Sequence, residues 1–147
     1  MFGGMPTAGA VSPAVIVIAV AVAIVWTVSL VRFDVREQRL PDWLTLPAGV
    51  LAIIVCCFAP VGAWGLIWPA AYLLTAVSGI GGGDIKLALP LGVAVAVAGG
   101  VLAVLLAILL SSLITVIALI ATQRSGMAHG PSMLASAWIV VIACTIT

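Results

Sequence analysis

The feature that most constrains the fold of this chain is a series of long apolar runs separated by short breaks. The first run, residues 13–31, contains no charged residue. At 1.5 Å per residue, a helix over this run would be about 28 Å long, close to the thickness of the hydrocarbon core of a bilayer. The run is too long for the apolar core of a secretory signal, and no Lys or Arg precedes it. We therefore expect a membrane-spanning helix here and not a cleaved signal peptide.

The composition excludes a water-soluble globular domain. Hydrophobic residues make up 65% of the 147 residues and charged residues only 6%, whereas soluble domains are about 25% charged. Too few polar side chains are present to cover a water-exposed surface. The net charge of +1 gives no indication of a nucleic-acid ligand. We therefore expect the lipid bilayer as the surroundings of the chain, and no nucleic-acid partner.

Prolines, glycines and charged residues divide the chain into about six predicted membrane-spanning helices. Pro69 is expected to kink the third helix, and Gly99-Gly100 to form an uncharged turn between the fourth and the fifth. The prediction is an all-α polytopic membrane protein that forms a single domain over residues 1–147. The expected helices cover residues 13–31, 43–59, 63–78, 84–98, 101–121 and 131–147.

The positive charges predict the orientation in the membrane. With six spans, the breaks at residues 32–42, 79–86 and 122–130 lie on one face, and all five Lys or Arg residues fall within them. The positive-inside rule assigns such a face to the cytoplasm. The sequence therefore predicts a protein of the cell inner membrane with both termini outside the cytoplasm.

Asp34 and Asp84 are expected at similar depth, each at the cytoplasmic end of an apolar segment. Two carboxylates that share a site cannot both ionise at low cost, so the pair holds one proton between them. The ionised acid can take a proton from water while the protonated acid polarises a peptide carbonyl, which gives a neutral gem-diol. We therefore expect an aspartic catalytic dyad that needs no metal and no cofactor.

The residues before Asp84 are glycines, including Gly81 and Gly83. Glycines have no Cβ atom, so this backbone can adopt positive φ and lie close to an extended substrate. An alternative interpretation is structural, in which Asp84 caps a helix and Asp34 is a solvated loop charge.

Three further polar residues are given mainly structural interpretations. Asp42, which follows Pro41, is interpreted as the N-cap of the second helix. Lys86 is interpreted as an interfacial lysine that extends its ammonium group toward water. His129 lies in a polar break, and no function is assigned to it.

Three motifs resemble those of type IV prepilin peptidases. Residues 32–47, RFDVREQRLPDWLTLP, resemble the first signature, an Asp followed by polar residues and then (Ile/Leu)-Pro-(Asp/Asn)-x-Leu-Thr-Leu-Pro. Residues 81–87, GGGDIKL, are similar to the second signature, Gly-x-Gly-Asp with (Val/Ile)-Lys-Leu. Residues 130–134, GPSML, resemble the Gly-Pro-x-x-Leu element that opens the last helix of the family. The resemblance covers about residues 10–145, and the order of the motifs makes it specific.

This resemblance implies an intramembrane aspartyl protease that removes the basic leader of prepilin-like precursors on the cytoplasmic face. Asp34 and Asp84 match the two catalytic aspartates of the family, and the substrate would be a prepilin-like protein with a hydrophobic N-terminal helix. The remaining motif positions that we expect around the substrate are Gly81, Gly83, Lys86, Pro41 and Asp42.

The resemblance also distinguishes between branches of the family. The larger members carry an N-methyltransferase region with paired CxxC motifs, and this sequence contains neither. It therefore resembles the short, peptidase-only branch associated with Flp/Tad-type pili. His129 stands where the family often has an aromatic residue.

Three other function classes would account for parts of this sequence. A non-enzymatic membrane component of a pilus or secretion assembly would keep the same fold and use the acids as caps, so that loss of Asp84 would lower stability without any loss of turnover. A proton-relay transporter would need further intramembrane acids. Presenilin-like proteases pair Gly-x-Gly-Asp with Tyr-Asp, whereas this chain has Phe33-Asp34.

Overall fold

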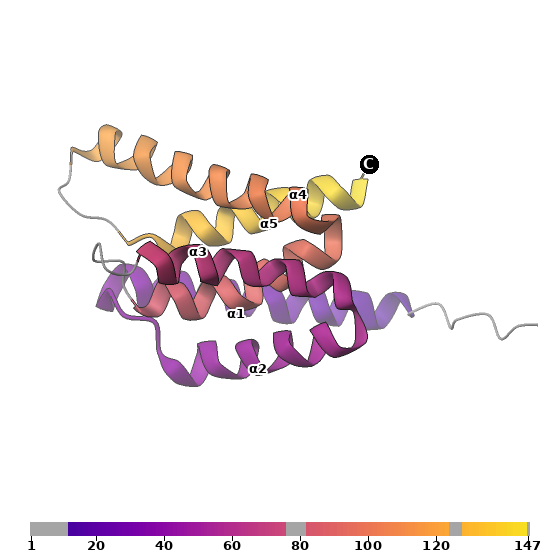
Figure 1. Cartoon of the computed structure of the whole chain (residues 1–147). Coiled ribbons are helices and arrows are strands. Elements are labelled where there is room, and N and C mark those ends of the chain that lie inside the picture. The colour runs from indigo at the N-terminus through magenta and orange to yellow at the C-terminus, as the bar shows by residue number, and fades with distance from the viewer. Residues whose placement is uncertain (1–11, 76–81, 124–127, 147) are drawn as a thin grey trace, which may run out of the picture.

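The regular structure of the chain is helical. The computed structural model describes residues 12–75, 82–123 and 128–146, and no strand occurs among them. The helices run roughly parallel or antiparallel to one another (Figure 1). The predicted all-α class is therefore confirmed. The elements are α1 (Pro13–Glu37), α2 (Asp42–Phe58), the 3₁₀-helix η1 (Pro60–Leu66), α3 (Ile67–Thr75), α4 (Gly82–Thr122) and α5 (Gly130–Ile146).

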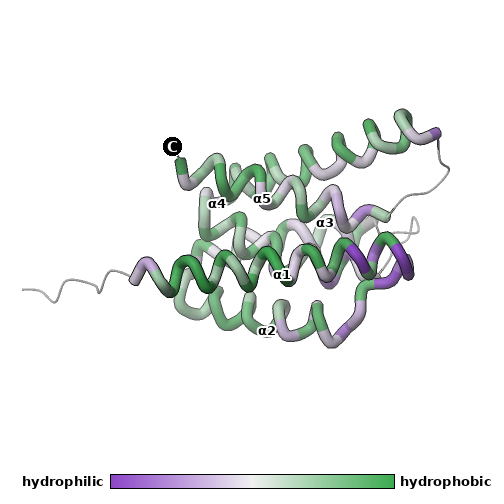
Figure 2. The backbone as a smooth tube through the Cα atoms, turned by 180° about the vertical axis from the view of Figure 1, so that it is seen from behind, coloured by the Kyte–Doolittle hydropathy of each residue, from purple (hydrophilic) through white to green (hydrophobic). Residues whose placement is uncertain are grey.

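The outer surface of these helices is apolar over most of their length. Figure 2 shows hydrophobic residues along the helices and hydrophilic residues gathered where α1 ends and α2 begins. Large exposed side chains such as Val17, Leu74 and Leu109 are all more than 60% exposed. Soluble monomers rarely expose continuous apolar surface of this kind, so the chain is a membrane protein.

Not every predicted membrane span is a helix long enough to cross a bilayer. Among the described residues, α1 and α4 have the length and apolar composition of a span, whereas α2, residues 60–74 and α5 are shorter apolar helices. The number of six spans therefore stays a prediction.

The long helix α4 reverses direction at its middle. A straight helix of its 41 residues would be about 60 Å long, twice the hydrocarbon thickness. At Gly100 φ is 67° and ψ is −159°, a conformation that is almost restricted to glycine. The two arms of α4 therefore fold back on each other (Figure 1), and the turn predicted at Gly99-Gly100 is confirmed.

The helix α4 lies at the centre of the molecule and contacts α2, η1, α3 and α5. The backbones of η1 and α4 approach closely where Gly65 and Gly92 lie directly against each other. A Cβ atom added to either glycine would clash with the backbone of the other. The buried hydrophobic core contains Leu30, Trp68, Leu87, Val95, Val104, Met133 and Leu134.

The third predicted helix differs from the observed structure. Residues 60–66 form a 3₁₀-helix, and α-helical geometry begins only at Ile67. Pro69 lies in the first turn of α3, where its missing N–H group costs least. The expected kink at Pro69 is therefore replaced by a change of helix type at Ile67. Residues 76–78, which were assigned to the same helix, lie outside the described residues.

The first helix is longer than predicted. It continues to Glu37 and ends at Gln38, whose φ of 50° is left-handed and whose backbone N–H donates to Asp34 O at 3.0 Å. Charged residues do not break a helix, and the first Pro after this run is Pro41. Asp34 therefore lies in the last turns of α1, and its interpretation as a loop charge is wrong.

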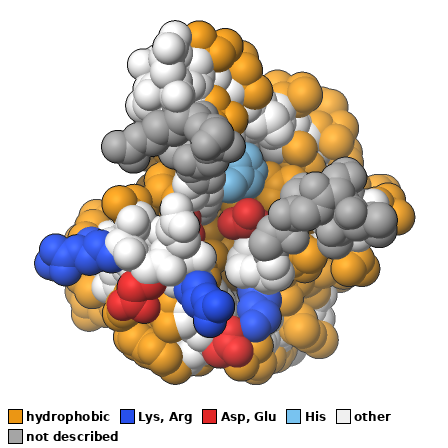
Figure 3. Space-filling model, turned by 90° about the vertical axis from the view of Figure 1, so that its left-hand side faces the viewer, with side chains coloured by type: hydrophobic (Ala, Val, Ile, Leu, Met, Phe, Trp, Pro, Cys, Tyr) orange, Lys and Arg blue, Asp and Glu red, His pale blue; other side chains and the backbone are white. Residues whose placement is uncertain are grey.

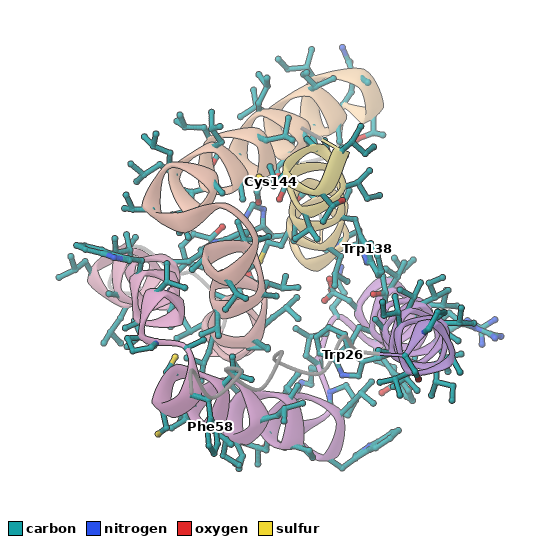
Figure 4. The ribbon with its side chains drawn as sticks, turned by 90° about the vertical axis from the view of Figure 1, so that its right-hand side faces the viewer. Trp26, Phe58, Trp138 and Cys144 are labelled. Carbon is teal, nitrogen blue, oxygen red and sulfur yellow. The ribbon has the colours of Figure 1, made fainter. Side chains whose placement is uncertain are left out.

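Two tryptophans connect α1 to the other helices. Trp26 Nε1 donates to the carbonyl of Leu44 in α2 at 3.0 Å, and Trp138 Nε1 of α5 donates to Thr27 Oγ1 at 3.0 Å. Figure 4 shows both indole groups lying between α1 and its neighbours. These contacts hold the helix that carries Asp34 against α2 and α5.

Candidate active site

A pocket of about 540 Å³ opens at the polar end of the molecule. Figure 3 shows acidic, basic and histidine side chains around a hollow in this surface. Asp34 and Asp84 both line the pocket, although they belong to different helices. Among the described residues, no three His, Cys, Asp or Glu side chains cluster as a metal site would require. The other lining residues are Gln38, Arg39, Leu40, Gly82, Gly83, Lys86, Ala128 and His129.

The side chain of Asp34 is less exposed to solvent than that of Asp84. Its relative exposure is 7%, and Gly130 at the start of α5 lies directly against Oδ2, so that an added Cβ would clash with it. The backbone N–H of Gly130 points to the carboxylate, but Oδ2 forms no hydrogen bond within the described part of the chain. One carboxylate oxygen of Asp34 is thus buried and unpaired.

Asp84 is partly buried and lies in the first turn of α4. The positive end of a helix dipole favours a carboxylate at this position. The carboxylates of Asp34 and Asp84 are close enough for electrostatic interaction. The structure therefore brings together the two acids that the sequence singled out.

The glycines before Asp84 do not adopt the conformation that we expected. Gly82 and Gly83 form the first turn of α4, and Gly100 alone among the described glycines has positive φ. Gly83 lies against Leu40, whose side chain would be 3.5 Å from an added Cβ. The expectation of positive φ is therefore wrong for Gly83, because α4 already begins at Gly82. Gly81 lies outside the described residues.

Lys86 and Asp42 form an ion pair at the rim of the pocket. Lys86 Nζ lies 2.6 Å from Asp42 Oδ1, with the two side chains 43% and 60% exposed. The N-cap of α2 is Pro41 and no side chain caps this helix, so the prediction of Asp42 as N-cap is wrong. Exposed pairs of this kind stabilise a fold by about 1 kcal/mol at most. The main effect of the pair is to connect the first turns of α2 and α4.

His129 is a pocket residue to which the sequence assigned no function. Its Nε2 lies 2.6 Å from Tyr72 Oη, and its Nδ1 lies 2.6 Å from Thr115 Oγ1. Burial lowers the pKa of His129 below its usual range, and the carboxylate of Asp34 acts in the opposite direction. A signal did exist in the sequence, because Ser111 and Thr115 place hydroxyl groups one helical turn apart in an apolar run.

The comparisons with known proteins agree with this arrangement. Residues 20–120, which include both acids, match the model of the type IV leader peptidase family. The chain is 30% identical over 130 residues to a "Prepilin leader peptidase/N-methyltransferase" of Neisseria gonorrhoeae. That match covers 79% of this chain and 45% of the relative, so the chain spans less than half the length of this curated protein. No solved structure matches the chain significantly.

The family match extends over more than half of the chain and contains the two acids that meet in the pocket. This chain therefore belongs to the type IV leader peptidase family.

Proposed function

We propose that this protein is a prepilin leader peptidase that works through an aspartic dyad of Asp34 and Asp84. The observation that carries the proposal is that both carboxylates line one pocket at the polar end of an otherwise apolar helical protein. A pair of acids in partly buried surroundings holds a single proton between them. The described residues would act as one peptidase domain.

The chemistry follows from that shared proton. The ionised carboxylate takes a proton from a water molecule, whose oxygen attacks the scissile carbonyl carbon, while the protonated carboxyl group donates its proton to the carbonyl oxygen. The product is a neutral gem-diol. A proton then passes to the leaving nitrogen, the C–N bond breaks, and the pair returns to its one-proton state. The unpaired Oδ2 of Asp34 provides an acceptor for such a proton.

The substrate that fits this site is a prepilin-like protein with a basic leader and a hydrophobic N-terminal helix. An apolar helix can reach the site through the bilayer, and the polar end of the molecule would meet the leader at the cytoplasmic face of the inner membrane. Gly83, Lys86, Pro41 and Asp42 lie at or beside this end, and we propose that they and Gly81 surround the substrate. Flp/Tad-type precursors are the proposed substrate class.

Co-expression with a candidate prepilin tests this function. We expect removal of the leader, seen as faster migration of the prepilin on a gel, and no removal by Asp34→Ala or Asp84→Ala. Undiminished cleavage by both variants would contradict the dyad. A non-enzymatic component would give no cleavage in the wild type, and Asp84→Ala would then only lower its stability.

A further inference from the structure

A cluster of hydroxyl groups from three helices surrounds the ring of His129. Tyr72 belongs to α3, Ser111 and Thr115 belong to α4, and Ser132 belongs to α5. Tyr72, Ser111 and Ser132 are each at most 7% exposed. An apolar protein that buries so many polar groups in one place must satisfy their hydrogen bonds among themselves. His129 is the residue that contacts all of them.

The hydrogen bonds of this cluster favour one position for the proton of the imidazole. Thr115 Oγ1 donates to the carbonyl of Ser111 at 3.0 Å, and Ser132 Oγ donates to the carbonyl of His129 at 2.6 Å. Each hydroxyl has a single proton. Ser132 Oγ also lies 2.6 Å from Thr115 Oγ1, and we take Ser132 as the donor in this contact too, with its proton shared between Thr115 Oγ1 and the carbonyl of His129. Thr115 Oγ1, whose own proton is directed to the Ser111 carbonyl, then accepts from Nδ1 at 2.6 Å. Nε2 is then an acceptor for the Tyr72 hydroxyl, also at 2.6 Å. The network is satisfied by a neutral ring with its proton on Nδ1.

The same cluster fixes the backbone that lies against Asp34. The carbonyl of His129 accepts from the backbone N–H of Met133 at 3.2 Å and from Ser132 Oγ, and so holds the first turn of α5. The next residue is Gly130, which lies directly against Oδ2 of Asp34. A displacement of the ring would therefore move the residue that limits the position of this carboxylate.

We propose that His129 is a positioning residue for Asp34, a neutral imidazole protonated on Nδ1 that holds the start of α5 against the carboxylate. This inference rests on the proposed function, because it concerns the same pair of acids. A neutral ring positions Asp34 without adding a positive charge that would favour loss of the shared proton. Tyr72 of α3 contacts the ring, and the carboxylate of Asp34 in α1 interacts with it electrostatically. The other charged groups that line the same pocket are Asp84 and Lys86 from α4 and Arg39 before α2; the described part of α5 contributes none to this lining.

The protonation of the ring can be measured without any substrate. His129 is the single histidine of the chain, so ring ¹⁵N labelling of the whole protein in detergent or lipid gives unambiguous NMR signals. We expect the Nδ1–H tautomer at neutral pH. Because the carboxylate of Asp34 raises the pKa of His129, we expect Asp34→Asn to lower that pKa by at least about half a unit. An Nε2–H tautomer, or an unchanged titration in Asp34→Asn, would overturn the proposal.

Kinetics then test the positioning role. In liposomes with a prepilin, we expect Thr115→Val to lower kcat roughly tenfold or more with KM changed less than about twofold, because only the alignment of the acids is affected. Thr115→Ser keeps the hydroxyl group and should restore kcat. Equal rates for the Val and Ser variants would overturn the proposal. An inactive wild type would instead contradict the proposed function, and the NMR result would still decide the state of His129.

Discussion

Asp34 lies against a residue without a side chain, and this contact leads to a first prediction. In Gly130→Ala, the new Cβ would clash with Oδ2 of Asp34, so the carboxylate must move. We expect kcat to fall roughly 100-fold, since small displacements of a reacting group have effects of this size. Cleavage of a prepilin by the purified variant in liposomes is the measurement.

A matched control is available in the same helix. Ala135 is exposed on α5, and Ala135→Ser also adds one heavy atom, so we expect its rate to stay near that of the wild type. Similar rates for Gly130→Ala and Ala135→Ser would show that Gly130 does not limit the position of Asp34.

His129 gives a prediction for the pH dependence of stability. Its pKa is lowered in the folded protein, first by burial and against the effect of Asp34. The unfolded chain therefore binds this proton first as the pH falls, so the contribution to stability is complete above the unfolded pKa of about 6.5 and is lost as the pH falls through the lowered pKa. We expect the wild type to lose more Tm on acidification below pH ~6.5 than His129→Gln. Parallel Tm curves for the two proteins would contradict this expectation.

The sequence predicted the two acids but not the surroundings that hold them. An acid in an apolar chain is conspicuous because its burial is costly, so Asp84 could be singled out as a candidate from the residues alone. Asp34 lies among other charged residues, and its motif was needed to single it out. The cluster around His129 depends on contacts between α3, α4 and α5, and no spacing along the chain reports such contacts. The role of Gly130 was missed for the same reason.

The crossing of η1 and α4 has a testable consequence for stability. Gly65 and Gly92 allow the two backbones to touch, and an added Cβ at Gly65 would clash with Gly92. We expect Gly65→Ala to lower the free energy of unfolding by about 1–3 kcal/mol, as overpacked cores do. Thermal unfolding in a mild detergent measures the change.

Gly49→Ala is the control for this crossing. Its added Cβ would meet only the flexible end of Leu89, at 3.3 Å, so a smaller loss of Tm is expected. An equal Tm for Gly65→Ala and Gly49→Ala would contradict this expectation, because it would show that the backbones of η1 and α4 can move apart at little cost in stability.

The boundaries of helices were predicted correctly where a single residue type determines the local backbone conformation. Gly99-Gly100 could be identified as a turn because glycine adopts conformations closed to other residues. The helix α1 ends later than the sequence predicts, because its charged residues continue the helix and nothing before Gln38 breaks it. The sequence did not predict the 3₁₀ geometry of residues 60–66, a segment that makes a close tertiary contact with α4 through Gly65.

The whole molecule has one polar end, and its orientation in the membrane can be measured. Gln38 is exposed at the polar end, whereas Ala59 follows the opposite end of α2. In a background without the native cysteines, we expect Ala59→Cys to react with a membrane-impermeant maleimide in spheroplasts. Gln38→Cys should react only after the membrane is permeabilised, because positive charges favour the cytoplasmic side. The reverse labelling pattern would place the pocket outside the cytoplasm.

The central claim is that Asp34 and Asp84 act as one catalytic pair. The rate of leader cleavage by the purified protein, followed over the pH range in which it stays folded, tests this claim most directly, with Asp34→Asn and Asp84→Asn as variants of nearly the same shape. We expect a bell-shaped profile for the wild type, because the pair must hold one proton, and background rates at every pH for each variant. A wild-type rate that rises steadily with pH, or a variant that keeps its activity, would contradict the account.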